Sequence, residues 1–435
     1  MRGVPSAESF RPVDVAIVGA GIVGCATAWR LAERGVKVAV FERGAVASEQ
    51  SSRAWGFIRQ QGRHEAEVPL AAEGNRLWNE LTARFGESAT QFTAAGILVP
   101  AETQADEERV LSGHEVATRF QLRTSILDRR EIATLIPELR GEWRSGLFTA
   151  GDAHGEPGLS TRTVAAAARA AGASIHEDTP VIDVEMRGGR ATALVTVRGR
   201  CNAATVVLAN GIGAPALARR VGLNLPIQLI RSSVGQTAAA KPFTRVAMWG
   251  PRVAYRPRAD GSFIIGNGYR GAGPDYDIAI DSLRNLRRFL LAYRLNWRLL
   301  RLSLGGEFLY RLRASLSRQA MARPLPEPAP NVRKIATNLT HFRAMFPHLD
   351  GITLERSWAG RIDLTPDVIP IIDRPDPNAN HFVAAGFSGH GFALGPAIGK
   401  QLSEWILDGR PSIDLRPFRL ARFQEDCVQR AQQAL

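Results

Sequence analysis

A glycine-rich turn between two short apolar runs constrains this chain more than any other feature. The run from Val13 to Val18 leads into Gly-Ala-Gly-Ile-Val-Gly (19–24), a helical pattern over 25–34 and a second apolar run over 36–41. Glu42 ends that second run, 18 residues beyond the third glycine. A strand, this turn, a helix and an acid at that spacing together predict a βαβ unit that binds a dinucleotide.

Each residue of this turn has a physical reason for its place. Gly19 permits the tight turn, Gly21 lets a pyrophosphate approach the backbone, and Gly24 lets helix and strand pack closely. The N-terminus of the helix offers free N–H groups to the phosphates, and Glu42 can accept hydrogen bonds from ribose hydroxyls. An ordinary βαβ turn with chance glycines is the weaker interpretation.

A second glycine-rich turn lies near the C-terminus. The predicted strand from His381 to Ala385 is followed by Gly-Phe-Ser-Gly-His-Gly-Phe (386–392) and a helical pattern from about 396 to 407. Two such turns in one chain suggest a long cofactor that is held at both ends.

Composition limits the class of protein. The chain has 435 residues, 45% of them hydrophobic and 22% charged, which predicts an ordered protein of two or three domains. Three cysteines make no disulfide framework, and no apolar run is long enough for a conventional transmembrane helix. We therefore expect a reducing, cytoplasmic location. Asp152, His154 and Glu156 share one turn without a fourth ligand nearby, so no metal site is expected.

The positive charge is concentrated in one stretch. The net charge is +13, and the stretch 283–323 contains ten arginines and one acid, Glu307. Between 283 and 304, leucines and aromatic residues recur at helical spacing with arginines between them. This pattern predicts a basic helical segment over 283–304. It fits an interfacial helix on an anionic membrane as well as a core-packed helix with exposed arginines.

Five segments carry a family resemblance. They are Val15–Gly24 with Glu42, the Ser-Ser-Arg of 51–53, 206–211, Trp358-Ala-Gly with Thr365-Pro-Asp, and 386–392. In this order they resemble the D-amino-acid oxidase, glycine oxidase and monomeric sarcosine oxidase family of FAD-dependent oxidoreductases.

The resemblance implies an α/β plus α+β protein with two domains in discontinuous segments. Residues 12–90, 150–225 and 356–435 would form a Rossmann-like FAD-binding domain. Residues 91–149 and 226–355 would form a substrate domain with a mostly antiparallel sheet. The same resemblance assigns FAD binding to Gly19, Gly21, Ile22, Val23, Gly24, Glu42, Arg43, Ser51, Ser52, Arg53, Ala54, Val181, Ala209, Asn210, Gly211, Gly360, Gly386, Gly389, His390, Gly391 and Phe392.

The chain departs from the family at several positions. Gly360 stands where sarcosine oxidases attach their flavin through a cysteine, so we expect non-covalent FAD. Ile264 and Ala393 occupy the places of a lysine that aids reaction with oxygen and of a carboxylate-binding lysine. Ile362 takes the place of the substrate arginine of glycine oxidase, with Arg361 one position away.

The resemblance implies oxidation of the C–N bond of an amino acid or N-substituted amino acid. Hydride transfer to flavin N5 would give an imine that water hydrolyses. A substrate carboxylate would need an arginine fork, for which Arg59 and Arg63 are the first candidates and Arg361 the next. Tyr255 and Tyr269 are candidates to close the pocket, and His390 is a candidate on the flavin side. Asp363 is expected to hold the substrate ammonium or to cap a turn.

The sequence leaves alternative functions open. The protein could be a flavin dehydrogenase subunit that passes electrons to a quinone or a protein partner, with 283–304 at a membrane surface or at that partner. It could also modify an amine side chain on tRNA, although the sequence has no evident stacking platform and nucleic acid is not expected as a partner. A nicotinamide dehydrogenase would leave the turn 386–392 without a role.

Overall fold

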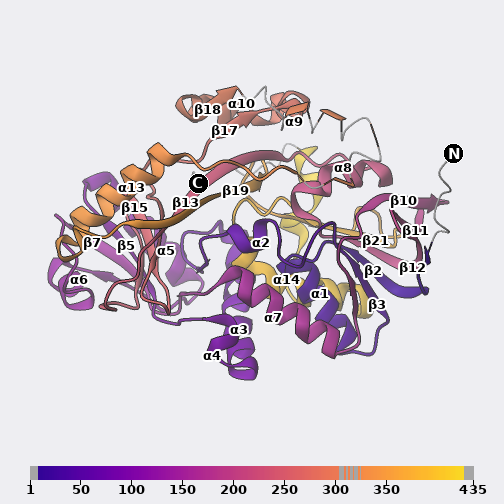
Figure 1. Cartoon of the computed structure of the whole chain (residues 1–435), viewed down its shortest axis with the longest axis horizontal. Helices are drawn as coiled ribbons and strands as arrows, with labels where there is room; N and C mark the ends of the chain where they lie inside the picture. The colour runs from indigo at the N-terminus through magenta and orange to yellow at the C-terminus, as the bar shows by residue number, and fades with distance from the viewer. Residues whose placement is uncertain are drawn as a thin grey trace.

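The computed structural model describes residues 8–302 and 325–425, together with 308–309, 312–313, 317 and 322–323. Two large sheets organise these residues, with helices packed on their outer faces (Figure 1). Short elements connect them: β1 (Glu8–Ser9), α2 (Gln50–Arg53), β4 (Phe57–Ile58), α4 (Glu87–Thr90), β8 (Ala153–His154) and α8 (Ala214–Ala218).

The first sheet has a parallel centre. Its strands are β9 (Ser174–His176), β3 (Val38–Phe41), β2 (Val13–Val18), β12 (Gly199–Leu208) and β21 (His381–Ala385). The antiparallel strands β10 (Val181–Arg187), β11 (Arg190–Thr196) and β20 (Ile371–Asp373) extend it. Strands that are distant in sequence meet here, and this arrangement confirms the Rossmann-like prediction.

Helices α1 (Ile22–Ala32), α14 (Gly391–Asp408), α7 (Pro157–Ala170) and α3 (Val68–Phe85) pack together beside the first sheet (Figure 1). Glycines let the two helices that begin at the glycine-rich turns cross closely. A Cβ on Gly395 would lie 2.5 Å from Ile22, and one on Gly399 would lie 2.6 Å from Ala26. The two turns are therefore brought to the same region of the molecule.

The second sheet is antiparallel except between β14 and β5. Its order is β19 (Leu354–Leu364), β13 (Gln228–Thr237), β16 (Phe263–Asn267), β15 (Val253–Pro257), β14 (Ala247–Trp249), β5 (Ile97–Ala101), β7 (Ser145–Thr149) and β6 (Thr124–Leu127). Helices α5 (Gln104–Arg119), α6 (Arg129–Leu135) and α13 (Val332–Met345) accompany it. The predicted domain boundary at 356 falls inside β19, which pairs with β13 along its length and so belongs to the second sheet.

The prediction of one helix over 283–304 is wrong for the part that the structure describes. The segment contains α9 (Ile280–Arg284), α10 (Leu286–Leu295), a 3-10 turn (Trp297–Leu299) and β18 (Leu300–Leu302), which pairs with β17 (Tyr276–Ile278). Asparagines flank α10 at 285 and 296, and the side-chain amide of Asn296 donates to the carbonyl of Ala292 at 2.9 Å, in competition with helical hydrogen bonds. Residues 303–304 lie outside the described residues.

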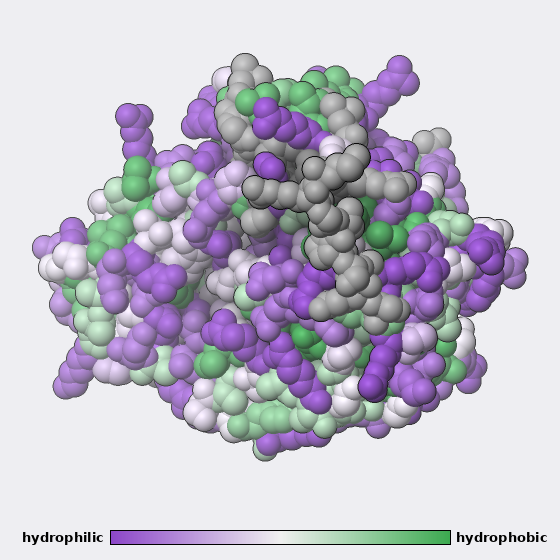
Figure 2. Space-filling view, turned by 45° about the vertical axis from the view of Figure 1, so that its right-hand side comes forward, coloured by the Kyte–Doolittle hydropathy of each residue, from purple (hydrophilic) through white to green (hydrophobic). Residues whose placement is uncertain are grey.

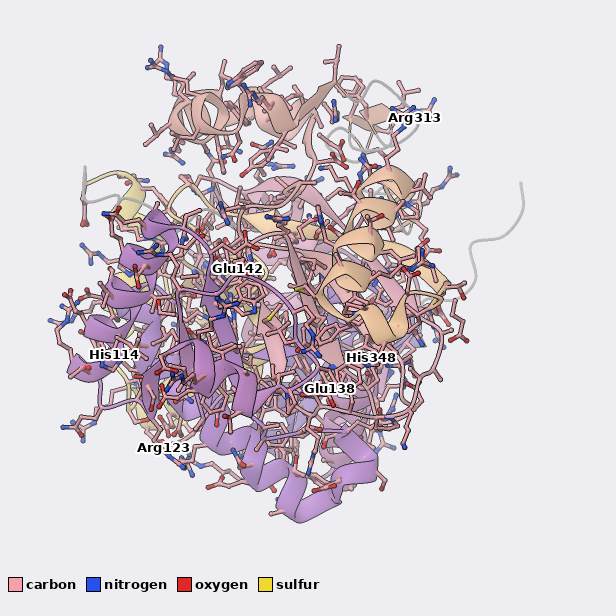
Figure 3. All side chains as sticks on the ribbon, turned by 90° about the vertical axis from the view of Figure 1, so that its left-hand side faces the viewer. His114, Arg123, Glu138, Glu142, Arg313 and His348 are labelled. Atoms are coloured by element: carbon pink, nitrogen blue, oxygen red, sulfur yellow. The ribbon has the colours of Figure 1, made fainter. Side chains whose placement is uncertain are left out.

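The segment 280–302 forms an outer layer of the molecule, as Figures 1 and 3 show from two directions. Phe289 and Tyr293 point inward, whereas Leu290, Leu291 and Leu295 are at least half exposed. Figure 2 shows hydrophobic side chains on this layer next to hydrophilic ones. Among the described helices, none has both the length and the apolar character needed to cross a bilayer.

Candidate active site

A cavity of about 390 Å³ lies where the two sheets meet. Its walls come from both glycine-rich turns, from the segment between 47 and 64, and from β13 and β19. The predicted cofactor and substrate residues gather around this one space. The cavity is lined by Gly19, Gly21, Ile22, Val23, Glu42, Arg43, Ser51, Arg53, Ala54, Val181, Ala209, Asn210, Gly211, Gly360, Gly389, His390, Gly391 and Phe392, and by Arg59, Arg63 and Arg361.

Three residues predicted to bind FAD do not line the cavity. A Cβ on Gly24 would lie 2.0 Å from the carbonyl oxygen of Gly19, so Gly24 serves the close packing of α1 against the turn. Ser52 directs its hydroxyl to the backbone of its own helical turn. Gly386 donates its backbone N–H to Asp363 at 2.8 Å. These three residues contact the segments that line the cavity and do not face the cavity themselves.

The first turn presents its backbone to the cavity. Gly19 has φ of 103°, and a Cβ there would lie 2.5 Å from the carbonyl oxygen of Ala209. Only glycine fits between these two strands. The carboxylate of Glu42 accepts from the N–H groups of Ala20 at 2.8 Å and Gly44 at 2.9 Å, which fixes it at the cavity wall. This cradle fits the adenosine and pyrophosphate part of a dinucleotide.

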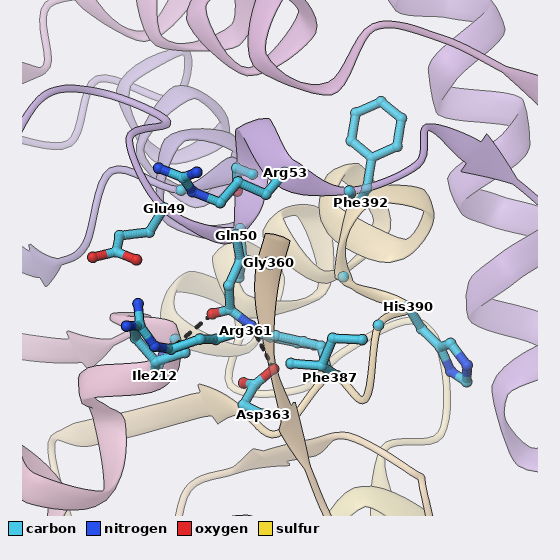
Figure 4. A pocket seen from close by; sticks show the side chains of 18 of the residues that line it. Glu49, Gln50, Arg53, Ile212, Gly360, Arg361, Asp363, Phe387, His390 and Phe392 are labelled. Atoms are coloured by element: carbon cyan, nitrogen blue, oxygen red, sulfur yellow. Dashed lines mark hydrogen bonds between the residues drawn. The ribbon is translucent and has the colours of Figure 1, made fainter. Parts of the chain in front are cut away.

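Gln50 links the two halves of the site, and no sequence signal pointed to it. Its side-chain amide donates to Asp363 at 2.7 Å and accepts from the N–H of Ile212 at 3.2 Å (Figure 4). Asp363 is fully buried, and burial raises its pKa. Because Gln50 and Gly386 engage both of its oxygens, the structure favours the turn-capping role of Asp363 over ammonium binding.

The second turn places His390 and Phe392 at the cavity. His390 precedes the first residue of α14, and its Nδ1 lies 2.9 Å from a carboxylate oxygen of Glu67. Figure 4 shows the imidazole directed away from Gln50 and Asp363. The ring of Phe392 packs against Trp78 with centroids 4.8 Å apart. The N-terminus of α14 therefore opens into the cavity.

Two arginines with buried guanidinium nitrogens line the cavity, close enough to His390 for their charges to act on it. The guanidinium of Arg59 lies 4.1 Å from the ring centroid of Trp249, and Arg63 is 7% exposed. Buried nitrogens of both side chains, Nε and one terminal nitrogen of Arg59 and one of Arg63, have no hydrogen-bond partner in the described part of the chain. Burial and the charge of Arg63 lower the pKa of Arg59 to about 9. A buried cation with unused donors is the arrangement expected of an anion site.

Arg361 points elsewhere. Its guanidinium donates to the carbonyl of Pro326, in the proline-rich segment 325–330. Arg53 forms an ion pair with Glu327 of the same segment. Arg361 therefore contacts the segment 325–330. Arg59 and Arg63 are better placed as a pair to bind a carboxylate in the cavity.

Tyr255 and Tyr269 do not line the cavity. Tyr255 is 1% exposed and packs edge-on against Phe342 with ring centroids 5.7 Å apart, in the hydrophobic core between the second sheet and α13. The hydroxyl of Tyr269 donates to the carbonyl of Pro100 at 2.7 Å. The prediction for Tyr255 is corrected because alternation along β15 turns its side chain to the core face. Trp249 is the aromatic residue that stands beside Arg59.

The three polar residues of the turn at 152–156 have separate partners. Asp152 accepts from the backbone of Gln60, His154 bonds the carbonyl of Arg245, and Glu156 pairs with Arg256. Within the described residues, no cluster of three or more His, Cys, Asp or Glu side chains has the arrangement of a metal site.

The cavity joins a backbone cradle for a dinucleotide to a region lined by Arg59 and Arg63. The family described as FAD dependent oxidoreductase matches residues 14–405 of the sequence. The chain belongs to this family. It is an FAD-dependent oxidoreductase, and the first-turn cradle and the opening of α14 fit the two ends of FAD.

Relatives cover nearly the whole chain. Glycine oxidase from Geobacillus kaustophilus is 25% identical over 94% of this chain and 97% of its own length. N-methyl-L-tryptophan oxidase from Salmonella arizonae is 27% identical over 95% of this chain and 99% of its own. The structure of L-amino acid deaminase from Proteus myxofaciens in complex with anthranilate superposes with a TM-score of 0.87 at 23% identity, covering 97% and 96% of the two chains.

Proposed function

We propose that this flavoenzyme oxidises the C–N bond of an amino acid or N-substituted amino acid, and that Arg59 and Arg63 bind the substrate carboxylate. The observation that carries the proposal is the pair of arginines, Arg59 and Arg63, whose buried nitrogens have unused donors in the cavity lined by the expected cofactor residues. Glycine oxidase and N-methyl-L-tryptophan oxidase, the relatives named above, support this substrate class.

The charges around the arginines support a carboxylate. Arg59 and Arg63 are two cations, and the acids that act on both are Glu67 and Asp152. Burial raises the pKa of Asp152 to about 7, so near neutral pH this acid is only partly ionised. With Asp152 only partly ionised, Arg59, Arg63, Glu67 and Asp152 together carry a net positive charge. A bound anion would neutralise this charge and offset part of the cost of burying Arg59.

The walls of the anion pocket would orient the substrate. Trp249 stacks on Arg59 and fixes the plane of its guanidinium fork, and a carboxylate held there bidentately has a defined direction. The remainder of the amino acid would then lie between Arg59 and the turn at His390. Bound FAD supplies the two-electron acceptor, and the residues of the chain bind, orient and exclude water.

The cofactor would be held without a covalent bond. No cysteine lines the cavity among the described residues, and Gly360 faces Arg53 at the position where sarcosine oxidases carry the attached cysteine. Both described cysteines are buried, and burial raises the pKa of Cys201 to about 11.

An anaerobic absorption spectrum tests the proposal. The purified yellow protein is mixed with a pool of amino acids and N-alkyl amino acids, and in parallel with the matching amino amides. We expect bleaching of the flavin by the acids and little by the amides. Protein that contains FAD but is bleached by neither pool, or by the amides equally, would contradict it.

A second candidate concerns the electron acceptor. We propose that residues 283–302 of the outer layer dock on an anionic membrane and that the enzyme delivers electrons to a quinone there. Leu295, Trp297 and Leu302 are 74%, 64% and 75% exposed. Exposed arginines accompany them at 284, 287, 288, 294, 298 and 301, with no acid between 283 and 302. Apolar side chains among cations fit an anionic lipid surface.

Cosedimentation with vesicles tests this second candidate. Binding to phosphatidylglycerol vesicles and not to phosphatidylcholine vesicles is expected, and R287E/R288E should remove it. A protein that stays in the supernatant with both vesicles excludes the membrane role. Rapid reoxidation of the reduced flavin by air would remove the need for a quinone.

A further inference from the structure

Helix α3 holds the N-terminus of α14 at three places. Glu67, which directly precedes α3, bonds His390. About two helical turns further on, Gly74 allows the carbonyl of Ala393 to approach within 2.5 Å of where a Cβ would be. The indole of Trp78 donates to that same carbonyl at 3.2 Å. The turn that faces the cavity is thus supported from behind by one helix.

Glu67 is the charged member of this support. It is 1% exposed and lines the cavity, and the positive groups close to it are Arg63, His64 and His390. Burial by itself would raise the pKa of Glu67, but the hydrogen bond to His390 and the positive charge of Arg63 outweigh burial and lower the pKa. Glu67 is therefore ionised at neutral pH.

His390 is the neutral partner. Burial and the charge of Arg63 lower its pKa, against the opposing effect of Glu67. A neutral imidazole that faces a carboxylate through Nδ1 carries its proton on Nδ1 and donates it. The pair therefore has one negative charge, located at the end of the cavity where α14 presents its positive dipole end.

We propose that Glu67 is a positioning residue for the flavin: through His390 it fixes the turn at the N-terminus of α14, and its charge counters Arg63 and the helix dipole at the part of the cavity where that turn would hold the flavin. The inference requires bound FAD but no particular substrate. It is therefore independent of the proposed amine oxidation.

Glu73 provides a matched control. It lies on α3 and pairs with Lys400 of α14 at 2.6 Å, so it joins the same two helices, but it does not line the cavity. E67L and E73L each remove one acid that ties α3 to α14. E67Q keeps a hydrogen-bond acceptor at His390 and removes only the charge. The readouts are the melting temperature, the FAD dissociation constant of the apoprotein, and the flavin midpoint potential.

We expect E67L to weaken FAD binding about tenfold and to raise the midpoint potential, because a buried charge-assisted hydrogen bond and a negative charge are lost. E67Q should raise the potential and leave FAD affinity within about threefold. E73L should lower the melting temperature only. The proposal is overturned if E67L behaves like E73L. If E67L does not fold, an unchanged potential in E67Q overturns it.

Discussion

Replacing Arg59 by methionine tests the anion pocket most directly. Methionine keeps a long side chain against Trp249, whose ring centroid lies 4.1 Å from the guanidinium, and removes the charge and all donors. Two charge-assisted hydrogen bonds to a carboxylate contribute about 3 kcal/mol together, which corresponds to about a hundredfold in affinity. The free enzyme should be as stable as wild type or more so, because the burial that lowers the pKa of Arg59 makes its charge costly in the folded protein.

Anthranilate is a suitable probe, since the L-amino acid deaminase named above was solved in complex with it. Its binding is followed by the perturbation of flavin absorbance, and R59M should bind it about a hundredfold more weakly than wild type. Arg30 supplies a control, because it also stacks on a tryptophan, Trp29, at 4.4 Å but lies outside the cavity. R30M should bind anthranilate normally.

Anthranilamide separates charge recognition from shape. The neutral amide cannot use the second charged hydrogen bond, so wild type should bind it poorly and R59M should lose little further affinity. The reasoning is refuted if R59M binds anthranilate as wild type does. It is refuted equally if the variant loses the same factor for acid and amide.

Three further predictions concern residues around the site. Because the carboxyl of Asp152, with a pKa raised to about 7 by burial, ionises near Arg59 as the pH rises, anthranilate affinity in wild type should fall as the pH passes through about 7, and D152N should not show this step. G24A should lower stability by about 2–4 kcal/mol in urea titrations, since its Cβ would lie 2.0 Å from a carbonyl oxygen. Y255F should leave anthranilate affinity unchanged and stability equal or higher by about 1 kcal/mol, because the buried hydroxyl has no partner in the described residues.

The parts of this protein whose geometry is local could be predicted from its amino-acid sequence. The turn at 19–24 needs glycines because a backbone carbonyl occupies the space of a side chain, and that need is visible as spacing. The turn at 386–392 is equally predictable from the sequence, because it joins a buried strand to a helix. Glu42 follows from the same βαβ rule. These signals, with the family resemblance, were enough for the fold class and the cofactor.

The side-chain contacts across the cavity could not be predicted from the sequence, because they depend on the tertiary packing of distant segments. Gln50 reaches Asp363 across 313 positions and Glu67 reaches His390 across 323, and no periodicity encodes such contacts. Tyr255 turned to the core while Trp249 stood beside Arg59, because strand alternation and sheet placement fix the faces. The helical pattern over 283–302 ended at Asn296, and Leu300–Leu302 paired with β17 as a strand, because pairing with a strand that precedes it in the chain outweighed the helical pattern. Local backbone geometry determines the two glycine-rich turns, whereas long-range packing determines which side chains meet in the cavity between them.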